Sequence, residues 1–323
     1  MKPPEENTAP NTSSEVTGDR CIVDLFCGIG GVAQAAANLS QIAGESFSVT
    51  QAIDIDRRVH EIYQLNHQVT PTCKTLESIR EIATADLWWL SPPCQPYTAR
   101  GEGLADHDPR SAALANLIVQ IERLTPPTIA LENVPQFGGS VHHRRLLEVL
   151  QSKGYSVRSD VLCPTQFGVP MRRRRFYLRA SRVVEVDVIH FNRNPKPLAS
   201  FVNEGDWNDT NLLVSDDHRN RYAKAMDLVD PATRNATTAC FTSAYGKSPV
   251  QAGSYLHCSE RDQVRWFSPR EIGRLMGFGD KFLWPTEIDR RVRYQLLGNS
   301  LSVDVVEAVL QSITAPKQRL ASD

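Results

Sequence analysis

Short apolar runs alternate with stretches of helical periodicity along the first 180 residues. The apolar runs predict buried strands, which lie at 21–26, 47–54, 86–90 and 128–134. Between them, apolar residues recur every three or four positions at 57–66 and 112–124, a spacing that predicts amphipathic helices. Strands that alternate with helices are typical of a doubly wound α/β fold with a mostly parallel sheet.

The alternation continues to about residue 182 and then changes. A helix is predicted at 142–153, followed by strands at 155–162 and 174–181. From 190 to 260 the sequence is polar and has few long apolar runs, which is typical of a loop-rich region. Helical spacing returns at 268–278, where Ser268 and Glu271 have the spacing of a capping box. We expect a last helix, 303–312, to pack back on the first part of the chain.

These changes predict two domains. A catalytic, cofactor-binding domain is expected to comprise residues 20–182 together with 294–323, and a small target-recognition domain to comprise 183–293. The polar residues 1–19 contain no apolar segment of the kind found in signal peptides, so they are interpreted as a disordered leader.

Composition is that of an ordinary globular protein. The chain has 323 residues, of which 41% are hydrophobic and 23% charged, and its net charge is −1. This balance excludes a disordered chain and a protein that coats nucleic acid by bulk charge. The near-neutral sum conceals an uneven distribution, because residues 1–130 hold 9 basic and 16 acidic side chains, whereas 142–182 hold 10 basic and two acidic ones.

Cysteine usage and hydropathy indicate the compartment. The seven cysteines are odd in number and none stand as CxxC, so we expect reduced thiols, no zinc or other metal site, and a cytoplasmic protein, with the nucleus as the alternative. No apolar run approaches the length of about 18 residues that a membrane span requires. The oligomeric prediction is a monomer.

A glycine turn follows the first predicted strand. Gly28, Gly30 and Ala33 match G-x-G-x-x-G/A, and Asp54 ends the next strand, near the offset at which an acid binds an adenosine ribose. The pattern favours an adenosine-bearing ligand, either a nicotinamide cofactor or S-adenosylmethionine. A plain strand–helix turn is the alternative.

Residues 91–98 (SPPCQPYT) carry the first candidate for chemistry. Cys94 follows a predicted central strand, so it belongs at the carboxyl edge of the sheet, where ligands bind in such folds. A thiol becomes a nucleophile at neutral pH when its pKa falls. A buried structural cysteine is the alternative, but a loop with three prolines in five residues indicates a fixed backbone.

Two further segments carry charged candidates. Glu132 ends the strand at 128–134 and is expected at the same edge as Cys94, where a carboxyl group suggests acid–base work. Residues 172–175 are four consecutive arginines, which in a strand would point alternately to opposite faces. One pair would then enter the site while the other meets phosphates. A helix cap for Glu132 and a solvated surface for the arginines are the alternatives.

The ordered segments DLFCGIGG, SPPCQPYT, LENV, FGVPMRRRRFYL, RWFSPREIGRLMGF and LLGNSLSV resemble the cytosine carbon-5 methyltransferases over about residues 21–310. The resemblance implies a Rossmann-like methyltransferase fold and S-adenosylmethionine as cofactor. It implies that Cys94 attacks cytosine carbon 6 and that Glu132 holds ring nitrogen 3 and the exocyclic amine. It further implies that Arg175 binds the base carbonyl oxygen and that Arg173 supports the nucleophile. It places the cofactor at these positions: Phe26, Gly28, Gly30, Asp54, Ile55, Glu77 and Asn299.

One segment indicates the branch of the family. ACFTSAYG at 239–246 is similar to the Cys-Phe-Thr signature of members that methylate transfer RNA in the anticodon-loop region, so the implied partner is tRNA, with DNA as the alternative. Turning a base out of a loop costs less free energy than turning one out of a duplex. The predicted nucleic-acid contacts are Arg172, Arg174, Cys240, Phe241, Thr242, Lys281 and Arg291. Cys240 is open to two interpretations, a functional thiol or a core element.

Met171 departs from the family pattern, which has Gln or Asn before the arginine pair. Methionine cannot make an amide's hydrogen bonds, so a loop-fixing contact is expected to be missing or replaced. Competing functions are a non-catalytic nucleic-acid-binding relative, which leaves Cys94 and Glu132 without a purpose, and a nicotinamide oxidoreductase, which explains only the glycine turn. The basic residues of 261–293 share that stretch with five acidic ones, so a solvated face is the alternative to phosphate contacts.

Overall fold

The structure is a computed structural model that describes residues 19–42, 46–75, 78, 82–93, 112–191 and 193–313. The predicted leader, apart from Asp19, lies outside the described residues. Cys94 and Glu77 also lie outside them.

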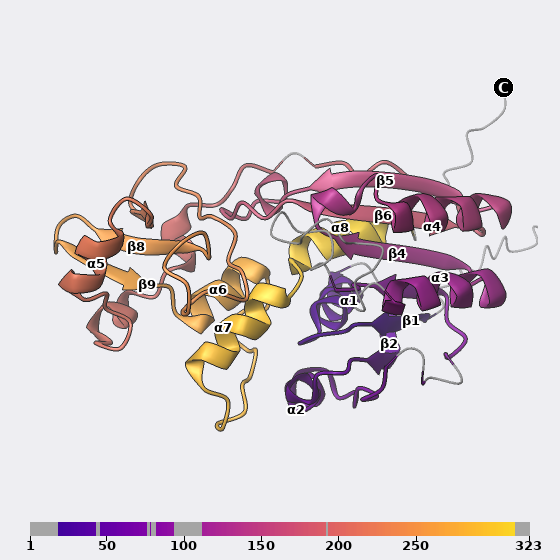
Figure 1. The fold of residues 1–323 in the computed structure, drawn as a ribbon, viewed down its shortest axis with the longest axis horizontal. Helices are drawn as coiled ribbons and strands as arrows, with labels where there is room; N and C mark the ends of the chain where they lie inside the picture. The colour runs from indigo at the N-terminus through magenta and orange to yellow at the C-terminus, as the bar shows by residue number, and fades with distance from the viewer. Residues whose placement is uncertain are drawn as a thin grey trace, which may run out of the picture.

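A six-stranded sheet forms the larger part of the molecule (Figure 1). Its strands are β1 (Arg20–Leu25), β2 (Phe47–Ile53), β3 (Leu87–Leu90), β4 (Thr128–Asn133), β5 (Ser156–Leu162) and β6 (Arg175–Ser181). They lie in the order β2-β1-β3-β4-β6-β5, and the first four are parallel. β6 is antiparallel to both β4 and β5. The prediction of a doubly wound, mostly parallel sheet is therefore confirmed.

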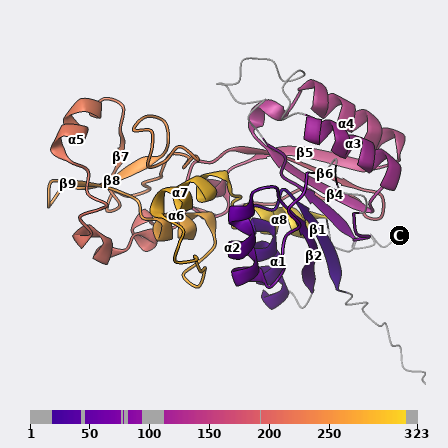
Figure 2. The same ribbon diagram turned by 60° about the horizontal axis from the view of Figure 1, so that its bottom comes forward.

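Helices cover both faces of this sheet (Figure 2). One face carries α1 (Gly31–Ile42), α2 (Arg57–His67) and α8 (Val303–Ser312), and the other carries α3 (Ala112–Leu124) and α4 (Val141–Ser152). Alternate strand residues supply the two cores, since Ile22 packs with the first group and Val23 with the second. As predicted, the last helix packs back on the first part of the chain, and Asn38 of α1 donates to Glu307 of α8 at 2.6 Å.

Residues 198–299, here named the smaller lobe, lie at one end of the six-stranded sheet (Figure 1). They contain a three-stranded sheet of β7 (Asp227–Val229), β8 (Ser254–Cys258) and β9 (Gln263–Trp266), with the helices α5 (Asp216–Tyr222), α6 (Pro269–Met276) and α7 (Arg290–Asn299). Short 3₁₀ helices complete the chain: η4 (Pro135–Phe137), η5 (Pro164–Gln166), η6 (Leu198–Phe201) and η7 (Glu204–Asn208). The capping box predicted at Ser268 and Glu271 begins α6.

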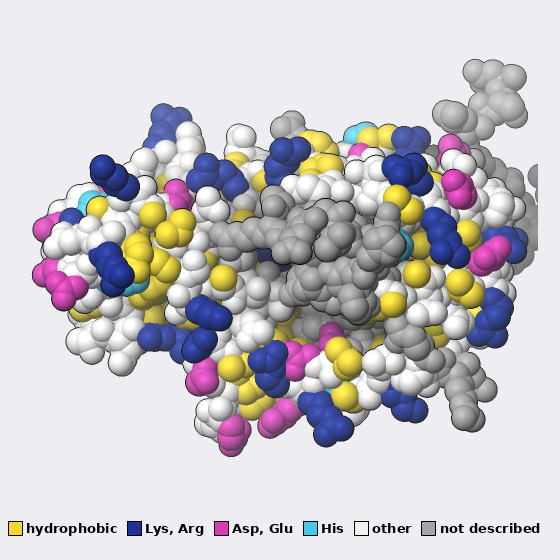
Figure 3. Space-filling model, in the orientation of Figure 1, with side chains coloured by type: hydrophobic (Ala, Val, Ile, Leu, Met, Phe, Trp, Pro, Cys, Tyr) yellow, Lys and Arg dark blue, Asp and Glu magenta, His cyan; other side chains and the backbone are white. Residues whose placement is uncertain are grey.

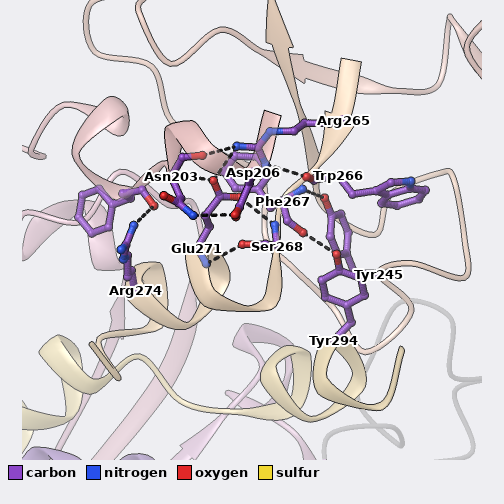
Figure 4. A network of polar contacts seen from close by, with 11 residues as sticks. Asn203, Asp206, Tyr245, Arg265, Trp266, Phe267, Ser268, Glu271, Arg274 and Tyr294 are labelled. Atoms are coloured by element: carbon purple, nitrogen blue, oxygen red, sulfur yellow. Dashed lines mark hydrogen bonds and ion pairs between the residues drawn. The ribbon is translucent and has the colours of Figure 1, made fainter. Parts of the chain in front are cut away.

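A buried ion pair holds the smaller lobe together (Figure 4). Arg265 of β9 and Glu271 of α6 are fully buried and joined by two hydrogen bonds, of 2.7 and 2.8 Å. The same carboxylate accepts the backbone N–H groups of Asn203 and Ser268, and the Arg265 guanidinium lies 4.5 Å from the centroid of the Trp207 ring. The pair therefore joins a strand, a helix and the 203–207 turn.

Within the described residues, none of the helices combines the length and apolar character needed to cross a membrane.

Candidate active site

The site lies at the carboxyl edge of the parallel strands. β1 leads into the glycine turn, β2 into Asp54, β3 into the Pro92 segment, and β4 ends at Glu132 and Asn133. Parallel strands bring these ends to one edge, which is where α/β sheets bind ligands. Asn133 is buried, and its side-chain amide donates to the carbonyl oxygen of Pro92 at 3.2 Å. The segment that leads to Cys94 is thus tied to the end of β4.

Glu132 and Arg175 meet across the β4–β6 pair. The Glu132 side chain is nearly buried, and its Oε1 lies 3.2 Å from Arg175 Nε. Burial raises the pKa of the Glu132 carboxyl, although the charges of Arg175 and Arg173 act in the opposite direction. A carboxyl group held in this way retains its proton to higher pH than usual and can offer it to a bound base.

Arg173 is buried and connects three segments that are distant in sequence. Its Nη1 donates to Phe241 O at 3.0 Å and lies 3.3 Å from Cys240 Sγ. Its Nη2 donates to the carbonyl oxygens of Gly298, at 3.1 Å, and Ser300, at 2.6 Å. The side chain therefore joins the arginine run to the Cys-Phe-Thr and Gly-Asn-Ser segments.

The four arginines alternate as predicted, although the strand begins only at Arg175. Arg173 is buried, whereas Arg172 and Arg174 are exposed. Backbone pairing explains the alternation before the strand begins, because Arg172 N donates to Thr238 O at 2.9 Å. Arg172 also lies 4.0 Å from Asp227, so this cation is partly neutralised.

Met171 shows what replaces the family's amide. The side chain is fully buried in the main apolar cluster. The loop is fixed by the backbone instead, since Thr238 N donates to Pro170 O and Arg172 N donates to Thr238 O, each at 2.9 Å. The loop-fixing contact expected to be missing is therefore replaced by main-chain bonds to the segment that precedes Cys240.

The Cys-Phe-Thr segment is packed tightly. Phe241 is 1% exposed and makes edge-on ring contacts with Tyr245 and Phe267. Its burial leaves it no surface for a nucleic acid in this conformation, in contrast to the predicted contact. Thr242 is partly buried, and its backbone lies against α7: a Cβ placed on Gly298 would lie 2.2 Å from the carbonyl carbon of Thr242.

The glycine turn after β1 is rigid and open to one side. Phe26, Gly28 and Gly30 have positive φ angles. Asp54 fixes the turn, because its carboxylate accepts Gly28 N–H at 2.9 Å and Asp56 N–H at 2.8 Å. Gly30 has no room for a side chain, since a Cβ there would lie 2.2 Å from His67 Nε2, whereas nothing lies within 4 Å of a Cβ on Gly28.

The chemistry of this turn suits an adenosine-bearing cofactor with a charged tail. The Phe26 ring is partly exposed and Ile55 is 65% exposed, which leaves apolar surface beside the Asp54 carboxylate. Asn299, at the end of α7, is exposed as well. Below the turn lies Asp24, whose Oδ1 is buried without a hydrogen-bond partner among the described residues. Burial raises the pKa of Asp24 to about 8, against a hydrogen bond from Tyr63 that lowers it.

Most basic residues of 261–293 have partners within the protein. Arg265 is buried in its pair with Glu271, while Arg270 and Arg274 both bind Asp280. Arg290 and Arg293 donate to backbone carbonyls. Lys281 and Arg291 are exposed, in agreement with their selection as surface contacts, although their exposure does not test what they bind.

Two functional candidates escaped sequence reasoning. Asp24 interrupts the apolar run CIVDLF. A single acidic residue in a strand that is buried on both faces is rare, and this could have marked Asp24 as a candidate. Gly298 stands within a helix, where glycine is unfavourable and therefore indicates close packing.

Comparison with known proteins decides the family. The model of the C-5 cytosine-specific DNA methylases matches residues 21–315. The chain belongs to this family. The tRNA (cytosine(38)-C(5))-methyltransferase of Schizosaccharomyces pombe is 30% identical over 91% of this chain and 97% of its own. The Homo sapiens enzyme of the same name is 26% identical over 90% and 98%.

Structures of family members agree with the fold. The crystal structure of the S. pombe Dnmt2 methyltransferase superposes on this methylase with a TM-score of 0.76 and 28% identity. It covers 91% of this chain and 97% of the other. The chain therefore has a Rossmann-like methyltransferase fold.

Proposed function

We propose that the protein methylates carbon 5 of a cytosine in tRNA, with S-adenosylmethionine as methyl donor. The observation that carries the proposal is the Glu132–Arg175 pair at the carboxyl edge of the sheet, joined through Arg173 to the Cys-Phe-Thr segment. Relatives named for tRNA cytosine methylation, similar over nine-tenths of the chain, support the substrate.

In the proposed reaction, the Cys94 thiolate adds to carbon 6 of the extruded cytosine. Glu132 gives its proton to ring nitrogen 3 in that step, which prevents negative charge from building up on the ring. Arg175 binds the base carbonyl oxygen. Once carbon 5 has been methylated, its proton is lost to a base and Cys94 leaves carbon 6 as a thiolate. The proton on nitrogen 3 returns to Glu132, which restores the neutral aromatic ring.

The cofactor, when bound, supplies an electrophilic methyl group. We propose that Phe26 and Ile55 cover the adenine and that Asp54 binds the ribose, while Gly28 gives the tail close access to the backbone. Glu77 is proposed at the adenine edge and Asn299 beside the tail. The anchored position of Asp54, fixed by two backbone N–H groups, supports its assignment.

In the proposal, the two domains expected from the sequence divide these tasks. Residues 20–182 and 294–323 form the catalytic part and 183–293 recognise the target. Arg172, Arg174, Lys281 and Arg291 are exposed and are proposed to contact phosphates. The protein is proposed to act as a monomer in the cytoplasm, with the nucleus as the other compartment open to it.

The second candidate is methylation of DNA, which the family's own description favours. Labelled S-adenosylmethionine incubated with the protein and either total tRNA or duplex DNA distinguishes the two. We expect label in tRNA. Label in DNA alone would overturn the RNA proposal.

A further inference from the structure

Cys240 lies between two guanidinium groups. Its Sγ is 3.3 Å from Arg173 Nη1 and 3.8 Å from Arg175 Nη2. The sulfur is also 3.6 Å from Phe241 O, to which a thiol could donate. That oxygen already accepts a shorter bond, of 3.0 Å, from Arg173. Arg173 is thus the closest partner of the sulfur, and Arg175 lies at about the same distance as the Phe241 oxygen.

In the part of the chain that the structure describes, few anionic groups contact the two cations Arg173 and Arg175. Arg173 is buried, and its other described partners are the backbone oxygens of Phe241, Gly298 and Ser300, which carry no net charge. Glu132 is the carboxylate that contacts Arg175, and burial favours its protonated form. A buried guanidinium without an anion is strongly unfavourable. Among the described residues, the Cys240 thiol is the acidic group in contact with Arg173, and it is shared with Arg175.

Two guanidinium groups face Cys240 and favour this state: Arg173 lies in the loop before β6, and Arg175 begins β6. Tyr177 of β6 stands opposite Glu132 of β4 in the sheet. Burial alone would raise the pKa of the Cys240 thiol, but the two guanidinium groups outweigh it and hold the pKa below its ordinary value. Burial raises the pKa of Tyr177, so its phenol stays neutral and does not compete as an anion.

We propose that Cys240 is a thiolate in the folded protein and acts as the counter-ion of Arg173 and Arg175, which makes it a positioning residue. Its negative charge holds both guanidinium groups in place while Glu132 keeps the proton it donates to the base. The proposal rests on the proposed function only in assigning the arginines and Glu132 to the base pocket.

The first test measures the ionisation itself and needs no nucleic acid. The ultraviolet absorbance of thiolate is compared between the native protein and Cys240→Ser as pH is varied. Below about pH 8, where an ordinary thiol of pKa about 8.5 is protonated, the native protein should retain the signal of one additional thiolate. The same subtraction in urea is the control and should show ordinary ionisation. Absence of the difference in the folded protein would overturn the proposal.

The second test separates charge from packing. Cys240→Asp keeps a negative group beside the arginines, whereas Cys240→Ser removes it. Methyl transfer should fall by about tenfold or more in Cys240→Ser, the rate equivalent of one lost charged hydrogen bond, and should be partly restored in Cys240→Asp. The variants should also differ in the pH profile of the rate. Equal rates and profiles would contradict a counter-ion. Absence of methyl transfer in the native protein would instead count against the proposed function, and would leave the absorbance result standing.

Discussion

Asp24 and Glu132 are single carboxyl groups whose surroundings change their titration. Both are buried at the carboxyl edge of the sheet, and burial raises the pKa of each. Glu132 has an arginine partner, which suits a group that must hold and release a proton. Among the described residues, the hydrogen-bond partner of Asp24 is the Tyr63 hydroxyl, at 3.2 Å, and burial keeps the carboxyl group neutral over most of the physiological range.

Asp24→Asn should change the pH dependence of stability. Because the pKa of Asp24 is about 8 in the folded protein and about 3.9 in an unfolded chain, the folded state binds the additional proton between these values. Its contribution is complete below about pH 4 and is lost as pH rises to about 8. The native free energy of unfolding should therefore fall on the order of 2 kcal/mol more than that of the variant between about pH 6 and 8. Urea unfolding at several pH values measures this, and parallel pH curves would contradict it.

The helices and strands differ in how well the sequence predicts them. The strands of the larger sheet were predicted to within about two residues. The parallel strands β1 to β4 were recognisable because buried parallel strands leave continuous apolar runs bounded by glycine, proline or helix starts. The small strands β7 to β9 were missed, since they have three to five residues and carry polar side chains such as Asp227 and Gln263. α7 was missed because three arginines occupy its first four positions.

Several residues of the candidate site were predictable from the sequence, but their contacts were not. The order of its segments identified Glu132 and the arginines, but the partners of Arg173 are 67 to 127 residues away in sequence and no local pattern encodes them. The contact of α7 with the Cys-Phe-Thr segment likewise exists only in three dimensions. Gly298 makes that contact possible, and it gives a test at the scale of elements.

Gly298→Ala should separate α7 from the Cys-Phe-Thr segment. A Cβ at this position would lie 2.2 to 2.4 Å from Thr242 and Ser243 backbone atoms, so one of the two segments must move. Because Arg173 donates to Gly298 O, the base pocket moves with it. We expect methyl transfer to fall by about a hundredfold or more, as small displacements of catalytic groups do.

Gly273→Ala is the matched control. This glycine also lies in a helix, α6, but nothing is within 4 Å of a Cβ placed on it. The substitution should leave the rate unchanged and stabilise the protein by about 0.5 to 1 kcal/mol. Similar losses of activity in both variants would show that the close approach at Gly298 is not the cause.

The whole molecule is neutral by cancellation and continuous in its core. Lys and Arg side chains are spread over the face shown in Figure 3, on the smaller lobe as well as on the sheet domain, with Asp and Glu side chains interspersed among them. The main apolar cluster runs from Ile22 of the sheet through Leu297 of α7 to Phe267 in the smaller lobe. We therefore expect the lobes to unfold together.

Glu271→Gln tests that continuity from within the smaller lobe. The substitution leaves the Arg265 cation buried without its anion and should reduce the free energy of unfolding by about 3 to 5 kcal/mol. Asp280→Asn is the control: it removes a half-exposed partner of Arg270 and Arg274, and surface pairs contribute about 1 kcal/mol or less. Denaturant unfolding followed by fluorescence and by circular dichroism should give coincident transitions in both variants. Separate transitions in Glu271→Gln would contradict a shared core.

The central claim is that this chain methylates carbon 5 of a cytosine in tRNA through Cys94. Its most direct test is to incubate unmodified tRNA with the cofactor and with either the native protein or Cys94→Ala, and to map the modified nucleoside by mass spectrometry. We expect 5-methylcytosine at a defined tRNA position with the native protein and none with Cys94→Ala, which should still bind the cofactor. The same 5-methylcytosine with Cys94→Ala, or none with a native protein that folds and binds the cofactor, would contradict it.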